Sequence, residues 1–330
     1  MVMSKNLFMD KRAIMWKFFI AVLVLVISLA VILLLYYGID WSSNSDKKIC
    51  HQSIVLRSSV TLGDLPTQEI VPLNCKTEKI CLNRGDKCSE FGFEEKIRRE
   101  KISSNEDKAK EDVLELFANE LYDCHDTVGR GLLQFMPKTW SSNSYCLMCS
   151  RIALDEESKE LVKEITYLEL YAYMKNKKVD GVSLLERTYG IKRLDDMEEA
   201  LNVALEINNK KTNTQLESIE DFKIDLTQEN AIVVQMSPDN VWKKYTAGTL
   251  GAVGGGALVV GGIVAAPFSL GSSLSLTAVG IGVVAGGATG GVIYSSNFAE
   301  DDSRYVYPTV YPYTIESLRG LECSSFETAP

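Results

Sequence analysis

The chain has 330 residues, with 35 Lys and Arg against 44 Asp and Glu and a formal net charge of −9. Positive and negative side chains are interleaved, and no basic stretch carries aromatic residues between its charges, so the composition argues against nucleic acid as a partner. The length would accommodate two average domains, from which any membrane segment must first be subtracted.

An uncharged run of twenty residues, FFIAVLVLVISLAVILLLYY, occupies positions 18–37. At about 1.5 Å per residue, a helix of that length spans the roughly 30 Å core of a bilayer. No small-residue cleavage site follows the run, as a signal peptide would require. Lys and Arg outnumber Asp in residues 1–17, and the positive-inside rule then makes these residues a cytoplasmic tail. We therefore expect an uncleaved transmembrane anchor at the cell membrane, with the main domain extracytoplasmic.

All eight cysteines follow this predicted anchor. An even number of cysteines on the outer side is typical of an oxidising compartment, so we expect disulfide bonds. The spacing leaves 105 pairings open. The cysteines are Cys50, Cys75, Cys81, Cys88, Cys124, Cys146, Cys149 and Cys323.

Hydrophobic patterns predict a mixed α+β domain over residues 38–245, large enough to bury a sizeable core. A polar stalk at 39–48 precedes short strands, which we expect at 53–60, 69–75 and 77–82. A capping box near Ser104 predicts a helix whose buried face carries Val113, Phe117, Leu121 and Cys124. The remaining elements are a loop at 129–149, helices at 155–177 and 194–208, and a strand at 230–236.

An uncharged, glycine-rich region follows, and 14 of the 23 glycines lie between Lys244 and Glu300. Small residues recur there every fourth position, which gives a smooth helix ridge for close packing in a membrane. We expect a helical hairpin in the membrane over 246–294, used for oligomerisation or for insertion; a flexible linker is the alternative. The ridge residues are Ala247, Gly251, Gly255, Ala278, Gly282, Gly286 and Gly290.

The Tyr/Pro-rich tail, residues 295–330, is expected to be extended and extracytoplasmic. It could lie along the domain and be fastened there by Cys323, because two membrane crossings return that residue to the side of the other cysteines. A disordered end is the alternative.

The stretch GRGLLQFMPKTW, residues 129–140, resembles the corresponding run of lytic transglycosylases. The resemblance implies a glycan-cleaving enzyme with Glu120 as the general acid and Gln134 in the substrate motif. Glu120 is followed by Leu121, where that family has Ser, so we favour no catalytic residue and keep the enzyme as the alternative. In the favoured interpretation the stretch is a loop held by cysteines, whose two glycines and Pro137 serve a turn and whose apolar residues pack inward: Leu132, Leu133, Phe135 and Met136.

Cys124, His125, Cys146 and Cys149 are of the types that bind Zn²⁺. They form an alternative metal site, but outside the membrane disulfides are the expected fate of the cysteines. We therefore predict no metal and no other cofactor.

Three segments in this order, LNCKTEKI (73–80), LYDCHDTVGRG (121–131) and YCLMCSRIAL (145–154), resemble a family of archaeal membrane-anchored, cysteine-containing proteins. His125 stands where that family has Trp. The resemblance implies an architecture and no activity. The prediction is a non-enzymatic surface protein whose partners are the lipid bilayer and either a second copy of the chain or another membrane protein.

Overall fold

The computed structural model describes residues 22–28, 44–59, 72–85, 88–89, 91, 96–133, 144–198, 201–202, 218–238, 262–263, 279–286, 289–297, 303–321 and 323–327. The chain divides into two units, residues 1–45 and 46–330. Residues 22–28 in the first unit are helical, and the rest of the expected anchor at 18–37 lies outside the described residues. Within the described ranges, no helix combines the length and the apolar character that a bilayer crossing requires.

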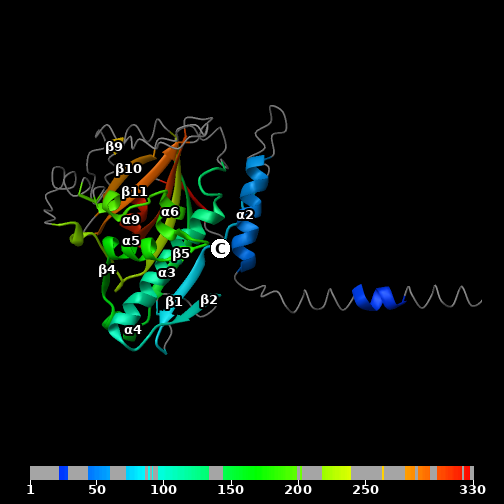
Figure 1. The fold of residues 1–330 in the computed structure, drawn as a ribbon, viewed down its shortest axis with the longest axis horizontal. Coiled ribbons are helices and arrows are strands. Elements are labelled where there is room, and N and C mark those ends of the chain that lie inside the picture. The colour runs from blue at the N-terminus through cyan, green and yellow to red at the C-terminus, as the bar shows by residue number, and fades with distance from the viewer. Residues whose placement is uncertain are drawn as a thin grey trace, which may run out of the picture. The chain divides into compact units, whose positions relative to one another are not determined.

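A mixed sheet is the centre of the second unit (Figure 1). Its strand order is β2-β1-β3-β8-β12-β11-β10-β9, and β13 pairs with β3 beside this path. The pairs among β2, β1, β3 and β13 are parallel, whereas β3-β8 and every pair beyond it are antiparallel. The strands are β1 (Glu78–Asn83), β2 (Ile97–Lys101), β3 (Ser144–Leu154), β8 (Asn230–Pro238), β9 (Gly262–Ile263), β10 (Val279–Gly286), β11 (Thr289–Asn297), β12 (Ser303–Pro312) and β13 (Cys323–Glu327).

Two strands share one edge of the long strand β3. β1 pairs with Ser150–Leu154, and β13 pairs with Ser144–Leu147. The register of β3 against β8 shifts between Met148 and Ser150, which makes Cys149 the extra residue of a bulge. Cys146 and Cys149 are three residues apart, so they point to opposite faces of the sheet and pack into different hydrophobic clusters.

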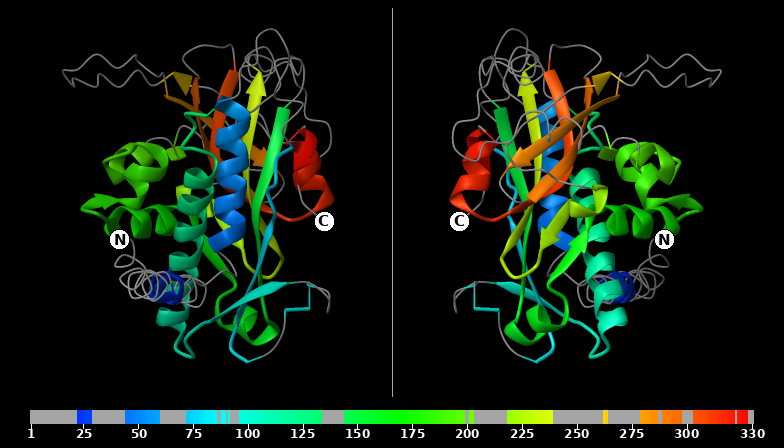
Figure 2. Two further views of the ribbon diagram at one scale, coloured as in Figure 1. Left: turned by 90° about the vertical axis from the view of Figure 1, so that its right-hand side faces the viewer. Right: turned by 90° about the vertical axis from the view of Figure 1, so that its left-hand side faces the viewer.

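Helices cover both faces of the sheet, as Figure 2 shows: α3, α5 and α6 lie on one side and the short α9 on the other. α2 joins the first layer, because its Cys50 and Ile54 belong to the same buried cluster as α3. The helices are α2 (Asn44–Ser59), α3 (Glu106–Thr127), α4 (Glu156–Leu161), α5 (Tyr167–Asn176), α6 (Leu184–Tyr189), the 3₁₀ turn η2 (Ile219–Asp221) and α9 (Ile315–Gly320). Two small ribbons, β4 (Glu164–Thr166) with β7 (Lys223–Asp225) and β5 (Lys178–Val179) with β6 (Val182–Ser183), complete the unit.

α3 is a helix of 22 residues that begins at Glu106. Asn105 caps its first turn by accepting a hydrogen bond from the Lys108 amide, one residue beyond the expected start at Ser104. The predicted stripe of Val113, Phe117, Leu121 and Cys124 is confirmed, since each is at most 2% exposed. Burying side chains of this size contributes about 1.5–3 kcal/mol each, so the stripe fixes the rotation of α3 on the sheet.

The predicted strands at 77–82 and 230–236 are confirmed as β1 and β8. The strand expected at 53–60 is wrong, because these residues continue α2 to Ser59. Cys50, Ile54 and Arg57, spaced by four and three residues, form its buried face, and this helical period prevails over the β-branched composition. No strand forms at residues 72–75, the described part of the one expected at 69–75.

Two further predictions are wrong in part. The loop expected at 129–149 ends earlier, because β3 begins at Ser144. The helix expected at 155–177 is divided into α4 and α5 by β4, whose Ile165 pairs with Ile224 of β7. For the helix expected at 194–208, residues 194–198 and 201–202 are helical and the others lie outside the described residues.

The glycine-rich region forms strands where it is described. β9, β10 and β11 take the place of the expected helical hairpin, so that prediction is wrong for these residues, including Gly282, Gly286 and Gly290. In VGIGVV the alternation of Val and Ile with Gly has a period of two, which places the β-branched side chains on one face of a strand. Ala247, Gly251, Gly255 and Ala278 lie outside the described residues.

The tail lies along the domain, as expected, and is a central part of it. β12 pairs with β8 from Ser303 opposite Pro238 to Pro312 opposite Asn230. Tyr305 and Val310 of β12 are buried in the main core. The domain predicted to end at residue 245 therefore also requires the tail.

All eight cysteines are in disulfide bonds, which confirms the expected framework. The bonds join Cys50 to Cys75, Cys81 to Cys88, Cys124 to Cys149 and Cys146 to Cys323. The last fastens the tail to β3 across 177 residues of sequence, as predicted for Cys323.

Candidate functional site

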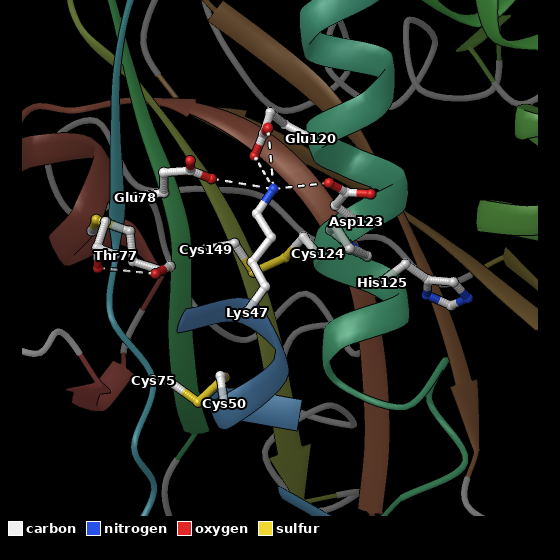
Figure 3. Close-up of a disulfide and its surroundings, with 12 residues drawn as sticks. Lys47, Cys50, Cys75, Thr77, Glu78, Glu120, Asp123, Cys124, His125 and Cys149 are labelled. Atoms are coloured by element: carbon white, nitrogen blue, oxygen red, sulfur yellow. Dashed lines mark hydrogen bonds and ion pairs between the residues drawn. A yellow bond between two sulfur atoms is a disulfide. The ribbon is translucent and has the colours of Figure 1, made fainter. Parts of the chain in front are cut away.

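Five charged side chains from four elements meet beside the C-terminal half of α3. Figure 3 labels four of them, Lys47, Glu78, Glu120 and Asp123. α3 supplies Glu120 and Asp123, which share a helix face because they are three residues apart. The other three come from α2, β1 and β2: Lys47, Glu78 and Arg98. We call these five residues the charged cluster.

The Lys47 ammonium is at the centre of the charged cluster. Its Nζ lies 3.2 Å from each carboxylate oxygen of Glu120 and 2.8 Å from Asp123 Oδ2. Glu78 Oε2 is also 3.2 Å away. Lys47 therefore contacts three carboxylates, and the contacts hold the start of α2 against α3 and β1.

Arg98 supplies the second cation. Its Nη2 donates to Glu120 Oε1 at 2.8 Å, and its Nη1 donates to Glu78 Oε1 at 2.9 Å. Glu120 is thus paired with two cations, which is the arrangement that a buried carboxylate requires to offset its loss of hydration.

The cluster runs from the core to the surface. The side chain of Glu120 is 3% exposed, that of Lys47 25% and that of Asp123 43%. Burial raises the pKa of Glu120 above its ordinary value, and Lys47 and Arg98 oppose this rise. For Lys47, burial favours the neutral amine, but the carboxylates of Glu120, Asp123 and Glu78 outweigh it and raise the pKa of the ammonium. Lys47 is consequently protonated at neutral pH.

Two disulfides flank the cluster, Cys50–Cys75 and Cys124–Cys149 (Figure 3). Together with Lys47, Glu120 and other residues they line a pocket with an internal volume of about 20 Å³. That volume holds about one water molecule, whereas pockets for small organic ligands measure roughly 300–1,000 Å³. The pocket that the described residues form beside Glu120 is therefore smaller than a sugar ring requires.

His125 follows Cys124 on α3 and points away from Lys47 (Figure 3). Its Nδ1 lies 3.0 Å from the Tyr305 hydroxyl, and its ring stacks on Tyr307 with 5.3 Å between the centroids. Burial, and then the Arg130 guanidinium, lower the pKa of His125 to about 4. The imidazole is therefore neutral at neutral pH and belongs to a buried aromatic group.

Of the residues proposed for a glycan-cleaving enzyme, Glu120 faces Lys47 and Arg98, and Gln134 lies outside the described residues. The alternative zinc site is wrong. Cys124, Cys146 and Cys149 are bonded to other cysteines and carry no thiolate, and Cys146 is bonded away from the other two. In the part of the chain that the structure describes, no group of three His, Cys, Asp or Glu side chains has the arrangement of a metal site.

The first residues of GRGLLQFMPKTW form the turn that ends α3. Gly129, Arg130 and Gly131 all have positive φ, of 74°, 58° and 69°. A Cβ on Gly131 would lie 2.5 Å from a ring carbon of Tyr305, so only glycine fits there. Leu133 packs against the core, but Leu132 is 80% exposed, so its expected inward packing is wrong. Phe135, Met136 and Pro137 lie outside the described residues.

Sequence reasoning missed Lys47, Glu78, Arg98 and Asp123 as partners of Glu120. The three-residue spacing of Glu120 and Asp123 beside a buried stripe was a usable signal, because it places both carboxylates at the border of the core. Lys47 carried no such signal, because it lies in a stretch that resembles a polar stalk.

No family model matches the chain, and neither a curated protein nor a solved structure matches it. Function is therefore argued from the geometry of this chain. The resemblances found in residues 73–154 stay predictions.

Proposed function

We propose that this chain is a membrane-anchored surface protein that displays its disulfide-stabilised α+β domain outside the cell and acts by binding. The observation that carries the proposal is the pairing of all eight cysteines in four disulfides. Disulfides persist in oxidising compartments and are rare in the cytosol.

The apolar run at 18–37 supports an anchor immediately before the domain. Six residues, 38–43, separate it from α2, and the first disulfide-bonded residue, Cys50, is in that helix. The charged cluster and Cys50–Cys75 fix α2 to the domain, so an anchored chain would hold the domain close to the bilayer.

The internal contacts support binding over catalysis. Glu120 beside the pocket and His125 beside the turn that ends α3 are both buried. Glu120 is paired with Arg98, and His125 contacts the Tyr305 hydroxyl. A general acid must reach its substrate, and the pocket that the described residues form beside Glu120 has the size of a water molecule.

The glycine-rich region is the part that we propose to contact the bilayer or a second copy of the chain. Its two ends lie side by side, because Pro238 of β8 pairs with Ser303 of β12, and its strands β11, β10 and β9 continue the sheet beyond β12. The intervening 239–302 is uncharged from Tyr245 to Ala299, which suits an apolar partner.

Membrane fractionation of expressing cells tests the proposal. We expect the full chain to stay in the pellet after alkaline carbonate extraction and a variant without residues 18–37 to be released. In intact cells, a membrane-impermeant amine reagent should label exposed lysines of the domain, such as Lys163 and Lys178. Release of the full chain by carbonate, or labelling only after lysis, would show that the proposal is wrong.

A further inference from the structure

The contact between Lys47 and Asp123 differs from the other lysine–carboxylate pairs. Nζ and Oδ2 are 2.8 Å apart, and Glu120 contacts the same ammonium with both oxygens. Lys110–Glu169 and Lys177–Glu115 are as close, at 2.6 and 2.7 Å, but both partners of each pair are more than a third exposed. Lys47 instead pairs with the buried carboxylate of Glu120, whose side chain is 3% exposed.

We propose that Lys47 and Asp123 condense into an intramolecular isopeptide bond, with Glu120 as the proton carrier. The bond would join α2 to α3 covalently. The inference goes beyond the proposed function and does not depend on it.

The reaction balances without an oxidant or a cofactor. Glu120 accepts a proton from the Lys47 ammonium, which frees the lone pair of the amine, and passes that proton to the Asp123 carboxyl. The amine nitrogen then attacks Asp123 Cγ and forms the C–N bond. A C–O bond of Asp123 breaks, and its oxygen leaves as water with a second proton that Glu120 carries from the nitrogen. One ammonium and one carboxylate become one amide and one water.

The fold holds the three groups ready for this step. Glu120 and Asp123 are fixed on one face of α3, and Arg98 holds Glu120 Oε1 in place at 2.8 Å. Cys50–Cys75 pins α2 three residues after Lys47. Groups fixed at contact distance react with effective concentrations of about 10⁵–10⁸ M in favourable cases.

The proton carrier Glu120 is buried, and the reacting carboxyl group of Asp123 is partly exposed. The buried Glu120 carboxylate, whose pKa burial raises, accepts a proton more readily than an exposed carboxylate. Asp123, at 43% exposed, lets the released water leave. Because three carboxylates stabilise the ammonium, the free amine is scarce and the reaction is slow. The proton that leaves Lys47 is the one that Asp123 receives, so the rate should change little with pH while Lys47 is an ammonium ion and Asp123 a carboxylate.

The mass of the full chain tests the proposal. After reduction of the disulfides, we expect a mass about 18 Da below that of the unlinked chain, and a branched peptide joining Lys47 to Asp123. Asp123→Asn should lose ammonia, about 17 Da, and give the same bond. Lys47→Arg and Glu120→Gln should keep the full mass. Lys110 and Glu169, in the same digest, should remain unlinked and serve as the internal control.

A full mass for the wild-type chain, isolated folded with its four disulfides and incubated at neutral pH, would overturn the proposal. So would a loss of water that maps to a residue other than Asp123. The wild-type measurement decides the question even where Glu120→Gln does not fold.

Discussion

The Nδ1 atom of His125 on α3 lies 3.0 Å from the hydroxyl of Tyr305 on β12, although 180 residues separate the two in sequence. Both side chains are buried. The contact joins α3, the longest helix among the described residues, to β12, and thus makes the Tyr/Pro-rich tail part of the core that α3 covers. It also places an ionisable ring where a charge has no hydration.

The stability of the domain should fall between pH 6.5 and pH 4 because of His125. Its pKa is lowered to about 4 in the fold, against an ordinary value of 6.5, so the unfolded chain binds the proton first. The His125 contribution is complete above pH 6.5 and is lost as the pH falls through 4. At pH 5 the loss is about 2 kcal/mol relative to neutral pH.

Urea unfolding at several pH values measures this loss. In His125→Phe the corresponding part of the pH dependence should disappear, although the variant is less stable at neutral pH because the Tyr305 hydroxyl loses a partner. His51→Gln is the matched control and should keep the slope. If the free energy of unfolding of His125→Phe depends on pH as it does in the wild-type chain, other groups cause the pH dependence.

Gly131→Ala should destabilise the domain by about 2–3 kcal/mol. The residue has φ 69°, and an added Cβ would meet the buried ring of Tyr305 at 2.5 Å. Gly85→Ala is the control, since its Cβ would have no neighbour within 4 Å, and we expect a change within about 0.5 kcal/mol. If Gly131→Ala and Gly85→Ala lower the free energy of unfolding equally, in thermal or urea unfolding, the structural role of the turn at residues 129–131 is contradicted.

Arg98→Met should cost about 2–3 kcal/mol, because it removes one of the two cations that offset the burial of Glu120. The comparison is Arg193→Met, which removes a pair between side chains that are 69% and 75% exposed. Surface pairs of that kind contribute little to stability, because water and salt screen them. If the two variants unfold at the same urea concentration, Glu120 does not depend on its cations as described.

Removing the Cys146–Cys323 bond should be more destabilising than removing Cys81–Cys88. The first closes 177 residues of sequence and the second 7. The loop-entropy relation gives about 5 kcal/mol for the first and about 2.5 kcal/mol for the second. The two double Cys→Ser variants are comparable in the sites that they change. Cys81, Cys88 and Cys146 are buried, and Cys323 is half-buried. The reverse order of unfolding free energies would show that the tail is held chiefly by β12.

Periodic patterns in the sequence predicted the elements with one buried face or one clear apolar run. The stripe of α3 and the run NAIVVQM of β8 were sufficient for that reason. β3 was missed because YCLMCSRIAL is interrupted by a bulge at Cys149 and lacks a regular alternation. α2 was missed because its β-branched residues favour a strand, whereas a disulfide at Cys50 and long-range pairs of Lys47 hold it as a helix.

The candidate site was predictable only through Glu120. Its partners come from elements 73 and 22 residues away, at Lys47 and Arg98, and no local pattern encodes such contacts. The same limit applies to the disulfides: their number followed from the cysteine count, but the pairing depends on the long-range contacts that bring Cys149 to α3 and Cys146 to β13.

The cysteine state of the protein inside living cells tests the central claim most directly. Cells are quenched with acid, free thiols are alkylated under denaturing conditions, and the digested chain is mapped by mass spectrometry without reduction. An extracytoplasmic domain predicts no alkylated cysteine and four linked peptide pairs, 50–75, 81–88, 124–149 and 146–323. Alkylation of all eight thiols would place the domain in a reducing compartment and contradict the account.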